Sequence, residues 1–245
     1  MVKKSIALIL ALLCSVPAFA GHPMITDDTG TQGRGRYLLE LNCGFSTNKI
    51  DANAGMAGAL TMGIADNIDL IVAPFFQWAP VKGIGDIPVQ VKWRIFGDEQ
   101  SGLSLALKPE FSIPTGDEKK GVGNGAFSGG MMIIVTQEAK QGDLHCNVGY
   151  IRNAYALASD AEVSRLDTWH ASIAAEIHVT EKLRSIADVG IDTNPDKTAN
   201  PHSVYLVGGM IYSVTNDFDF DFGVKRGFDN TLTDTMFLAG LTVSM

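Results

Sequence analysis

The sequence lacks the features of several common protein classes. Beyond residue 20 it contains no apolar run of the about 20 residues that a membrane-spanning helix needs, which excludes a helical membrane protein. No run of lysines and arginines follows that point and the net charge is −8, so we expect no nucleic-acid partner. Two of the three cysteines, Cys43 and Cys146, follow residue 20, and two are too few for a disulfide scaffold.

Residues 1–20 have the three parts of a secretory signal peptide. Lys3 and Lys4 form a positive start, residues 6–14 are apolar, and Ala18-Phe19-Ala20 matches the small-x-small pattern of a cleavage site. The apolar part is well short of the about 20 residues of a membrane anchor. We therefore expect an exported protein whose mature chain begins near residue 21.

Apolar residues make up 46% of the sequence, and after the first 20 residues they are dispersed. A strand with one apolar face shows apolar residues at every second position. Clear alternation of this kind occurs in six segments, near residues 37–46, 87–95, 103–112, 144–150, 169–179 and 218–225. Weaker alternation near 57–64, 68–77, 126–136, 184–192, 203–213 and 235–245 brings the total to twelve strands. An even number is typical of a single-chain bacterial membrane barrel.

The connections between these segments alternate between short and long. Short polar links are expected near 65–68, 97–102, 137–143, 180–183 and 214–217, and longer ones near 47–56, 78–85, 113–125, 152–165, 193–202 and 226–234. Short periplasmic turns and longer outer loops produce this rhythm, whereas a soluble sandwich or lipocalin-like barrel does not predict it. The sequence thus predicts an all-β fold: an antiparallel transmembrane β-barrel of about 12 strands in the outer membrane, with both termini periplasmic.

The final segment is itself an amphipathic strand, with apolar residues at every second position from Phe237 to Met245. It resembles the assembly signal of outer-membrane barrels, although most such signals end in an aromatic residue. We expect the barrel-assembly machinery to be a partner through this strand, and outer-membrane lipid to be a partner through the apolar face of the wall.

The polar face of a membrane barrel lines the lumen, because the apolar face points to lipid. The predicted lumen-lining residues are Glu40, Asn42, Gln90, Lys92, Arg94, Lys108, Glu110, His145, Asn147, His170, Glu176, His178, Asp188, Asp219, Asp221 and Lys225. Lys92 and Arg94 are expected near Lys108 and Glu110 on the next strand, which favours cross-strand charge pairs. Such pairs either stabilise the wall or set the selectivity of a pore.

Residues 21–35 are polar, rich in glycine and not strand-like. They form either a periplasmic N-terminal segment or a plug in the lumen, and residues 36–245 form the barrel. In a barrel of about eight strands, side chains fill the lumen, whereas sixteen or more strands leave an open channel. A barrel of twelve strands lies between these two sizes. A narrow or blocked lumen is therefore expected.

Neither a catalytic nor a metal site is recognisable, and we expect no cofactor. The glycine-rich loop at Gly121, Gly123 and Gly125 lacks the strand–turn–helix context of a nucleotide site. His170 and His178 share one face of a strand, but eight residues on a strand span about 26 Å, too far for one metal ion. No nucleophile elbow is present, so we expect no enzyme.

The two remaining cysteines give a geometric test of the strand count. Cys43 falls on the first expected strand and Cys146 on the seventh, both on the lipid face. These strands lie opposite each other in a closed barrel of twelve, whereas a disulfide needs Cα atoms within about 7 Å. We expect two free thiols.

Several stretches resemble a known outer-membrane family. They are HPMITDDTGTQGRGRYLLELNCGF, GIGDIPVQVKWRIF, KPEFSIPTGDEKKGVGNG and GDLHCNVGYI, with the short motifs Asp27-Asp28, Gly85-Asp86, Pro114-Thr115-Gly116-Asp117 and Gly142-Asp143. The family is labelled as a phenol-degradation meta-pathway protein and is similar to the channel that exports functional-amyloid subunits. The resemblance implies a twelve-stranded barrel that passes small molecules, aromatic or otherwise apolar. The amyloid-export relative carries a long N-terminal coiled coil, and the about 15 residues before the first strand here are too few for one.

These observations favour an outer-membrane channel for the passive passage of small solutes, including aromatic or apolar compounds. A structural or interaction barrel with a filled lumen is the main alternative. A barrel-rim hydrolase is the enzymatic alternative, and it requires a Ser-His pair within hydrogen-bond reach at the rim.

Overall fold

The computed structural model describes residues 21–47, 52–79, 81–98, 100–228 and 235–245. The expected signal peptide, residues 1–20, lies outside the described residues. Within the described part of the chain, none of the helices has the length and apolar character needed to cross a membrane.

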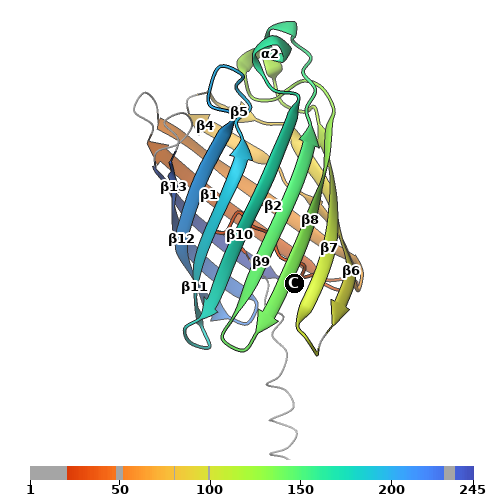
Figure 1. The fold of residues 1–245 in the computed structure, drawn as a ribbon, viewed down its shortest axis with the longest axis vertical. Coiled ribbons are helices and arrows are strands. Elements are labelled where there is room, and N and C mark those ends of the chain that lie inside the picture. The colour runs from red at the N-terminus through yellow and green to blue at the C-terminus, as the bar shows by residue number, and fades with distance from the viewer. Residues whose placement is uncertain (1–20, 48–51, 80, 99, 229–234) are drawn as a thin grey trace, which may run out of the picture.

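The chain forms one large antiparallel sheet (Figure 1). Its strand segments are β1 (Tyr37–Thr47), β2 (Ala52–Ala65), β3 (Ile68–Val72), β4 (Phe75–Ala79), β5 (Gly83–Ile84), β6 (Ile87–Asp98), β7 (Leu103–Ile113), β8 (Ser128–Ala139), β9 (Gly142–Arg152), β10 (Asp167–His178), β11 (Leu183–Thr193), β12 (His202–Thr215), β13 (Phe218–Gly227) and β14 (Thr235–Ser244). Among the described residues, two short helices, η1 (Glu118–Lys120) and α2 (Ala158–Val163), lie in the loops.

The sheet closes on itself. β1 pairs antiparallel with β2 on one side and with β14 on the other, so the first and last strands are neighbours. β3 and β4 both pair with β2 and together make one interrupted strand. β5 pairs with β4 and β6 pairs with β3, so β5 and β6 together make the next strand. The result is a closed barrel of twelve antiparallel strands, which confirms the predicted fold class and strand count.

The two interruptions correct the expected boundaries. The weak strand expected near 68–77 is broken at Ala73-Pro74, because proline has no backbone N–H for the ladder. The link expected at 78–85 contains the end of β4 and all of β5. A third difference is at β2, which begins at Ala52 rather than near residue 57.

Short turns gather at one end of the barrel and long loops at the other (Figure 1). Helix α2 belongs to the long-loop end. At the short-turn end, the N–H of Tyr37 donates to the carbonyl of Met245 and the N–H of Met245 donates to the carbonyl of Tyr37. The start of β1 and the end of β14 are therefore tied together at this end.

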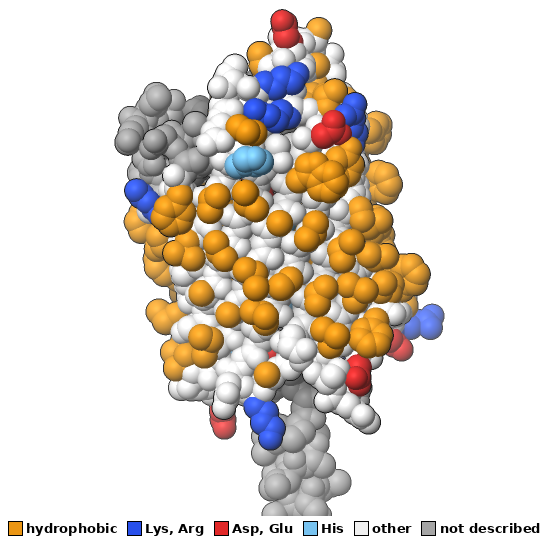
Figure 2. Space-filling view, viewed as in Figure 1, with side chains coloured by type: hydrophobic (Ala, Val, Ile, Leu, Met, Phe, Trp, Pro, Cys, Tyr) orange, Lys and Arg blue, Asp and Glu red, His pale blue; other side chains and the backbone are white. Residues whose placement is uncertain are grey.

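The outer wall is apolar. Figure 2 shows hydrophobic side chains spread over the wall, with charged groups mainly at the two ends. Trp78, Trp93 and Trp169 all point outward, with 44%, 47% and 58% of their surface exposed. Such exposure is costly in water, and it is what the lipid-facing side of a membrane barrel presents.

The closure can be tested with the protein's own cysteines, which are both free. Cys43 on β1 lies directly opposite Ala239 on β14, so Ala239→Cys places two thiols at a distance that a disulfide can span. We expect the oxidised, denatured variant of the mature chain to retain one free thiol, that of Cys146. The unchanged mature chain should retain two.

Leu241→Cys is the matched control. It lies on the same strand face but opposite Leu41, and the diagonal distance of about 7–8 Å to position 43 is too long for a disulfide. This variant should keep three free thiols. Three free thiols in Ala239→Cys as well would contradict the β1–β14 pairing.

Candidate functional site

The N-terminal segment, residues 21–36, enters the barrel: residues 22–32 contact the inner wall, and residues 34–36 are exposed. Its Met24, Thr26, Asp28, Thr29 and Thr31 are buried. Its hydrogen bonds reach the inner faces of β3, β6, β8, β9 and β11, which lie on different sides of the wall. The lumen is therefore crossed by the chain's own backbone.

Asp27 is held by two lysines of the wall. Its Oδ1 accepts from Lys92 Nζ at 2.8 Å, and its Oδ2 accepts from Lys108 Nζ at 2.6 Å. Asn147 holds the backbone of the same residue, accepting from its N–H at 2.6 Å and donating to its carbonyl at 2.8 Å. Burial raises the pKa of the Asp27 carboxyl, but the two ammonium groups outweigh burial and hold that pKa below its ordinary value.

This arrangement corrects the expected charge pairing. The ion pairs of Lys92 and Lys108 run to Asp27, with Asp28 as a longer partner of Lys92 at 3.8 Å. Glu110 instead accepts a hydrogen bond from Gln90. Two lysines on neighbouring inner faces repel each other, and the inserted carboxylate between them removes that repulsion.

The pKa of Asp28 is shifted in the opposite direction from that of Asp27. Burial raises the pKa of its carboxyl to about 7, and the neighbouring charge of Asp27 acts in the same direction. The ammonium of Lys92 and the N–H of Gly30 lower the pKa but do not compensate for burial. Asp28 therefore titrates near neutral pH while Asp27 stays ionised.

Two carboxylates of the wall accept backbone N–H groups from the segment. Asp188 accepts from the N–H of Ile25 at 2.6 Å and of Thr26 at 2.9 Å, and Asp69 accepts from the N–H of Gln32 at 3.0 Å. Both carboxylates are 1% exposed. A buried carboxylate is costly without donors, so these N–H groups stabilise the inner face as well as the segment.

Pro23 fits a notch made by two glycines. Gly209 on β12 and Gly223 on β13 are cross-strand partners, and a Cβ on either would lie 2.6–2.7 Å from the Pro23 ring. The absence of side chains there lets the segment approach the wall closely. Next to it, His22 Nδ1 lies 2.5 Å from Asp221 Oδ1.

One side of the inner wall is apolar rather than polar. Met24 packs into a buried cluster with Tyr205, Val207 and Ile211 of β12, Ile186 of β11, Ala174 of β10 and Leu238 of β14. A lumen filled only with water would expose these side chains. The inserted segment therefore satisfies the wall in two ways, with charge on one side and apolar contact on the other.

The structure spreads the predicted lumen residues along the barrel. Beyond those described, Glu40 and Asn42 line the cavity, His145 bonds Thr136, His170 bonds Asp192 and Ser172, Glu176 and His178 adjoin Asp143, Arg184 bonds Glu176 and Asp219, Lys225 lies over the Tyr205 ring, and Arg94 is half-buried on β6. The alternation of polar and apolar residues could not predict that residues 21–36 supply partners for the inner face of the wall. The only sequence signal for it is the Asp27-Asp28 pair within a polar, glycine-rich stretch.

A cavity of about 830 Å³ remains at the short-turn end of the lumen. Polar residues such as Glu40, Gln90 and Lys108 line it together with apolar ones such as Leu38 and Ile71. Residues of the N-terminal segment form part of its wall. The barrel thus holds an internal space for a small molecule, partly closed by its own chain.

A closed barrel of twelve strands with an apolar exterior and an internal cavity has the architecture of outer-membrane channels. The COG4313 outer membrane channel from Pseudomonas putida F1 matches with a TM-score of 0.67 at 10% identity, over 89% of this chain and 98% of that chain. The NanC porin matches with a TM-score of 0.65 at 13% identity, over 84% and 98%. The KdgM porin matches with a TM-score of 0.57 at 7% identity, over 84% and 99%. Identities this low show a shared fold.

The sequence itself identifies the family. Residues 16–245 match the model of the family described as "Putative MetA-pathway of phenol degradation", and the chain belongs to that family. This confirms the resemblance seen in the sequence. None of the curated protein sequences matches the chain.

Asp28 makes the docking of the segment depend on pH. A released segment has the ordinary Asp pKa of 3.8, whereas the docked one has a pKa of about 7. The contribution of Asp28 to docking is therefore largest below about pH 4, where this carboxyl is protonated in both states, falls as the pH rises to 7, and is constant above that. We expect cleavage of residues 22–32 by proteinase K to increase over this range.

Asp28→Asn is the control, because its amide carries no charge at any pH. The ratio of cleavage in the unchanged protein to cleavage in this variant should rise between pH 4 and pH 7, which also removes the pH dependence of the protease. A ratio that is flat with pH would contradict the role of Asp28.

Proposed function

We propose that the protein is an outer-membrane channel for the passive passage of small solutes, with aromatic or apolar compounds among them. The observation that carries the proposal is the internal cavity of about 830 Å³ in a closed membrane-type barrel. The solved structures that share the fold include an outer membrane channel and two porins, which supports a channel role.

The solute class is supported by the lining of the cavity. Met24, Ile25, Leu38, Ile71 and Ile211 contribute apolar surface beside the charged groups. A mixed lining of this kind binds a molecule with an apolar body and a polar end better than it binds a fully hydrated ion. The family description, which refers to phenol degradation, agrees with such a solute.

The cellular placement forms part of the same proposal. Residues 1–20 direct export, and the last strand is recognised by the barrel-assembly machinery. The short-turn end, with the start of β1 and the end of β14, faces the periplasm, and the loop carrying α2 faces outward.

The second candidate is a structural or interaction barrel with a filled lumen. The inserted N-terminal segment favours it, because residues 21–36 occupy space that a pore requires. The two candidates differ in one property. In a channel the segment controls the flow of solute, whereas in a structural barrel its removal opens no selective path.

Deletion of residues 21–34 tests the channel directly. The deletion removes Asp27 and its contacts to both sides of the wall, so single-channel conductance in planar bilayers should rise relative to the full mature barrel. Asp27→Asn removes only the charge that holds Lys92 and Lys108, and we expect it to give more frequent open events than the unchanged protein.

Fold is checked for each variant by heat-modifiability on a gel. Lys119→Gln, on an exposed position of η1 outside the lumen, is the matched charge control and should leave conductance unchanged. Well-folded barrels that show neither conductance nor solute flux, with and without residues 21–34, would reject the channel and leave the structural barrel.

A further inference from the structure

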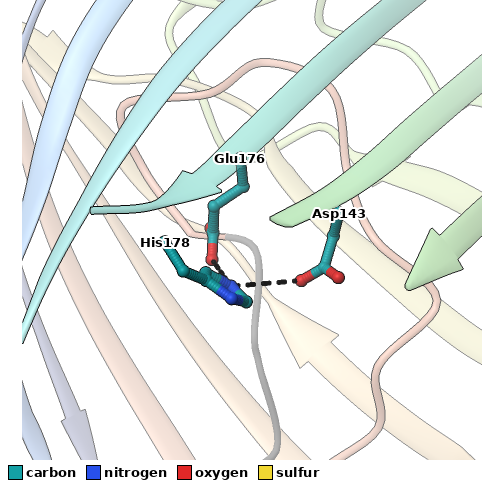
Figure 3. Close-up of side chains that lie close together, drawn as sticks. All are labelled: Asp143, Glu176 and His178. Carbon is teal, nitrogen blue, oxygen red and sulfur yellow. Dashed lines mark ion pairs between the residues drawn. The ribbon is translucent and has the colours of Figure 1, made fainter. Parts of the chain in front are cut away.

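A cluster of three side chains at the short-turn end of the wall is not used by the proposed channel. Asp143 lies near the start of β9, and Glu176 and His178 lie at the end of β10. Asp143 and Glu176 are direct cross-strand partners, and all three side chains converge on one point (Figure 3). One possible ligand atom from each residue lies within 4.8 Å of the other two.

The separations fit a shared cation better than direct hydrogen bonds. His178 Nε2 lies 3.5 Å from Asp143 Oδ2 and 3.5 Å from Glu176 Oε1. A charge-assisted hydrogen bond between such groups is about 2.7–2.9 Å long. Two ligand atoms each about 2.1 Å from a tetrahedral ion are separated by about 3.4 Å. The observed spacing is thus that of neighbouring ligands.

The burial of Glu176 gives a second, independent observation. This side chain is 1% exposed, and its Oε2 is buried without a hydrogen-bond partner among the described residues. A buried carboxylate oxygen of this kind is costly unless it is paired or coordinates a metal. The other oxygen of this carboxylate, Oε1, faces His178, and an ion held by both oxygens of Glu176 would give Oε2 a partner as well.

Asp143 is pre-oriented for the same role. Its Oδ1 accepts the N–H of Ala139, the last residue of β8, at 3.2 Å, which leaves Oδ2 directed at His178. A carboxylate that is fixed through one oxygen presents the other as a ligand with little loss of freedom.

The local charge also favours a cation. Arg184 Nη1 donates to Glu176 Oε1 at 3.2 Å, but the same guanidinium also pairs with Asp219. One arginine therefore serves two carboxylates, and Asp143 adds a third negative charge. A divalent ion balances the excess that remains.

We propose that Asp143, Glu176 and His178 bind one divalent transition-metal ion of the Zn²⁺ type. An imidazole with two carboxylates suits Zn²⁺, whereas Mg²⁺ and Ca²⁺ take oxygen ligands. His178 is 32% exposed and lines the large cavity, so the ion can enter from the lumen and keep one position open for water or a solute group. The site lies on the β9–β10 wall and is separate from the Asp27 contacts.

The test measures Zn²⁺ alone with the full mature barrel in detergent, after removal of metal with a chelator. Isothermal titration calorimetry should show one Zn²⁺ per barrel. His178→Ala should weaken binding by at least about tenfold, because loss of a direct ligand costs no less than loss of an outer-shell partner. Glu176→Gln should have the same effect, and Mg²⁺ should not compete.

His170→Ala is the matched control. His170 also pairs with one carboxylate, Asp192, on the same strand face, but among the described residues it belongs to no cluster of three ligands. This variant should keep full Zn²⁺ binding. If Glu176→Gln does not fold, His178→Ala decides alone, since the His178 side chain is partly exposed and its truncation leaves a smaller defect.

Absence of binding, or equal binding by the unchanged protein and His178→Ala, would overturn the proposal. Asp143, Glu176 and His178 would then be a polar cluster of the wall that binds no ion. Because the readout is metal affinity, its outcome does not depend on whether the barrel conducts solute.

Discussion

Closure of the backbone hydrogen-bond network is the constraint on which the structure depends. The interior of a membrane offers no water to an unpaired N–H or carbonyl, so a sheet that crosses it must have no edge. Pairing of β1 with β14 meets this condition, since it joins segments almost 200 residues apart along ten paired positions. Once the edge is removed, each strand has a lipid face and a lumen face, and the alternation of side chains follows.

A closed wall of this size has a second requirement at its inner face. The side chains of Lys92, Lys108, Asp69 and Asp188 point into the lumen with little of their surface exposed, and a charge that is buried in this way needs a partner. The N-terminal segment meets this requirement by placing a carboxylate between the lysines and backbone N–H groups on the aspartates. A segment that is polar and rich in glycine, and that would form no structure alone, becomes ordered because the wall supplies its partners.

The period of two and the long–short rhythm were enough to predict the barrel, the number of strands and the outward position of Cys43 and Cys146, because these depend on local sequence. The break at Ala73-Pro74 was missed although proline marks it, since a break and a link look alike when only composition is considered. The partners of Asp27 were beyond reach, because Lys92 and Lys108 are 65 and 81 residues away and nothing local relates them.

The same reasoning explains why a metal site was not recognised. His178 was compared with His170 along one strand, and the distance of about 26 Å excluded a shared ion. Neighbours in a sheet are set by register across strands, and the register of β9 with β10 brings Asp143 opposite Glu176, with His178 two residues further on the same face. Register in turn depends on the short turn that joins two strands and on which face must meet lipid. For a membrane barrel, a single sequence can therefore identify the wall residue by residue, whereas ligand sets become visible only when the hairpin registers are known.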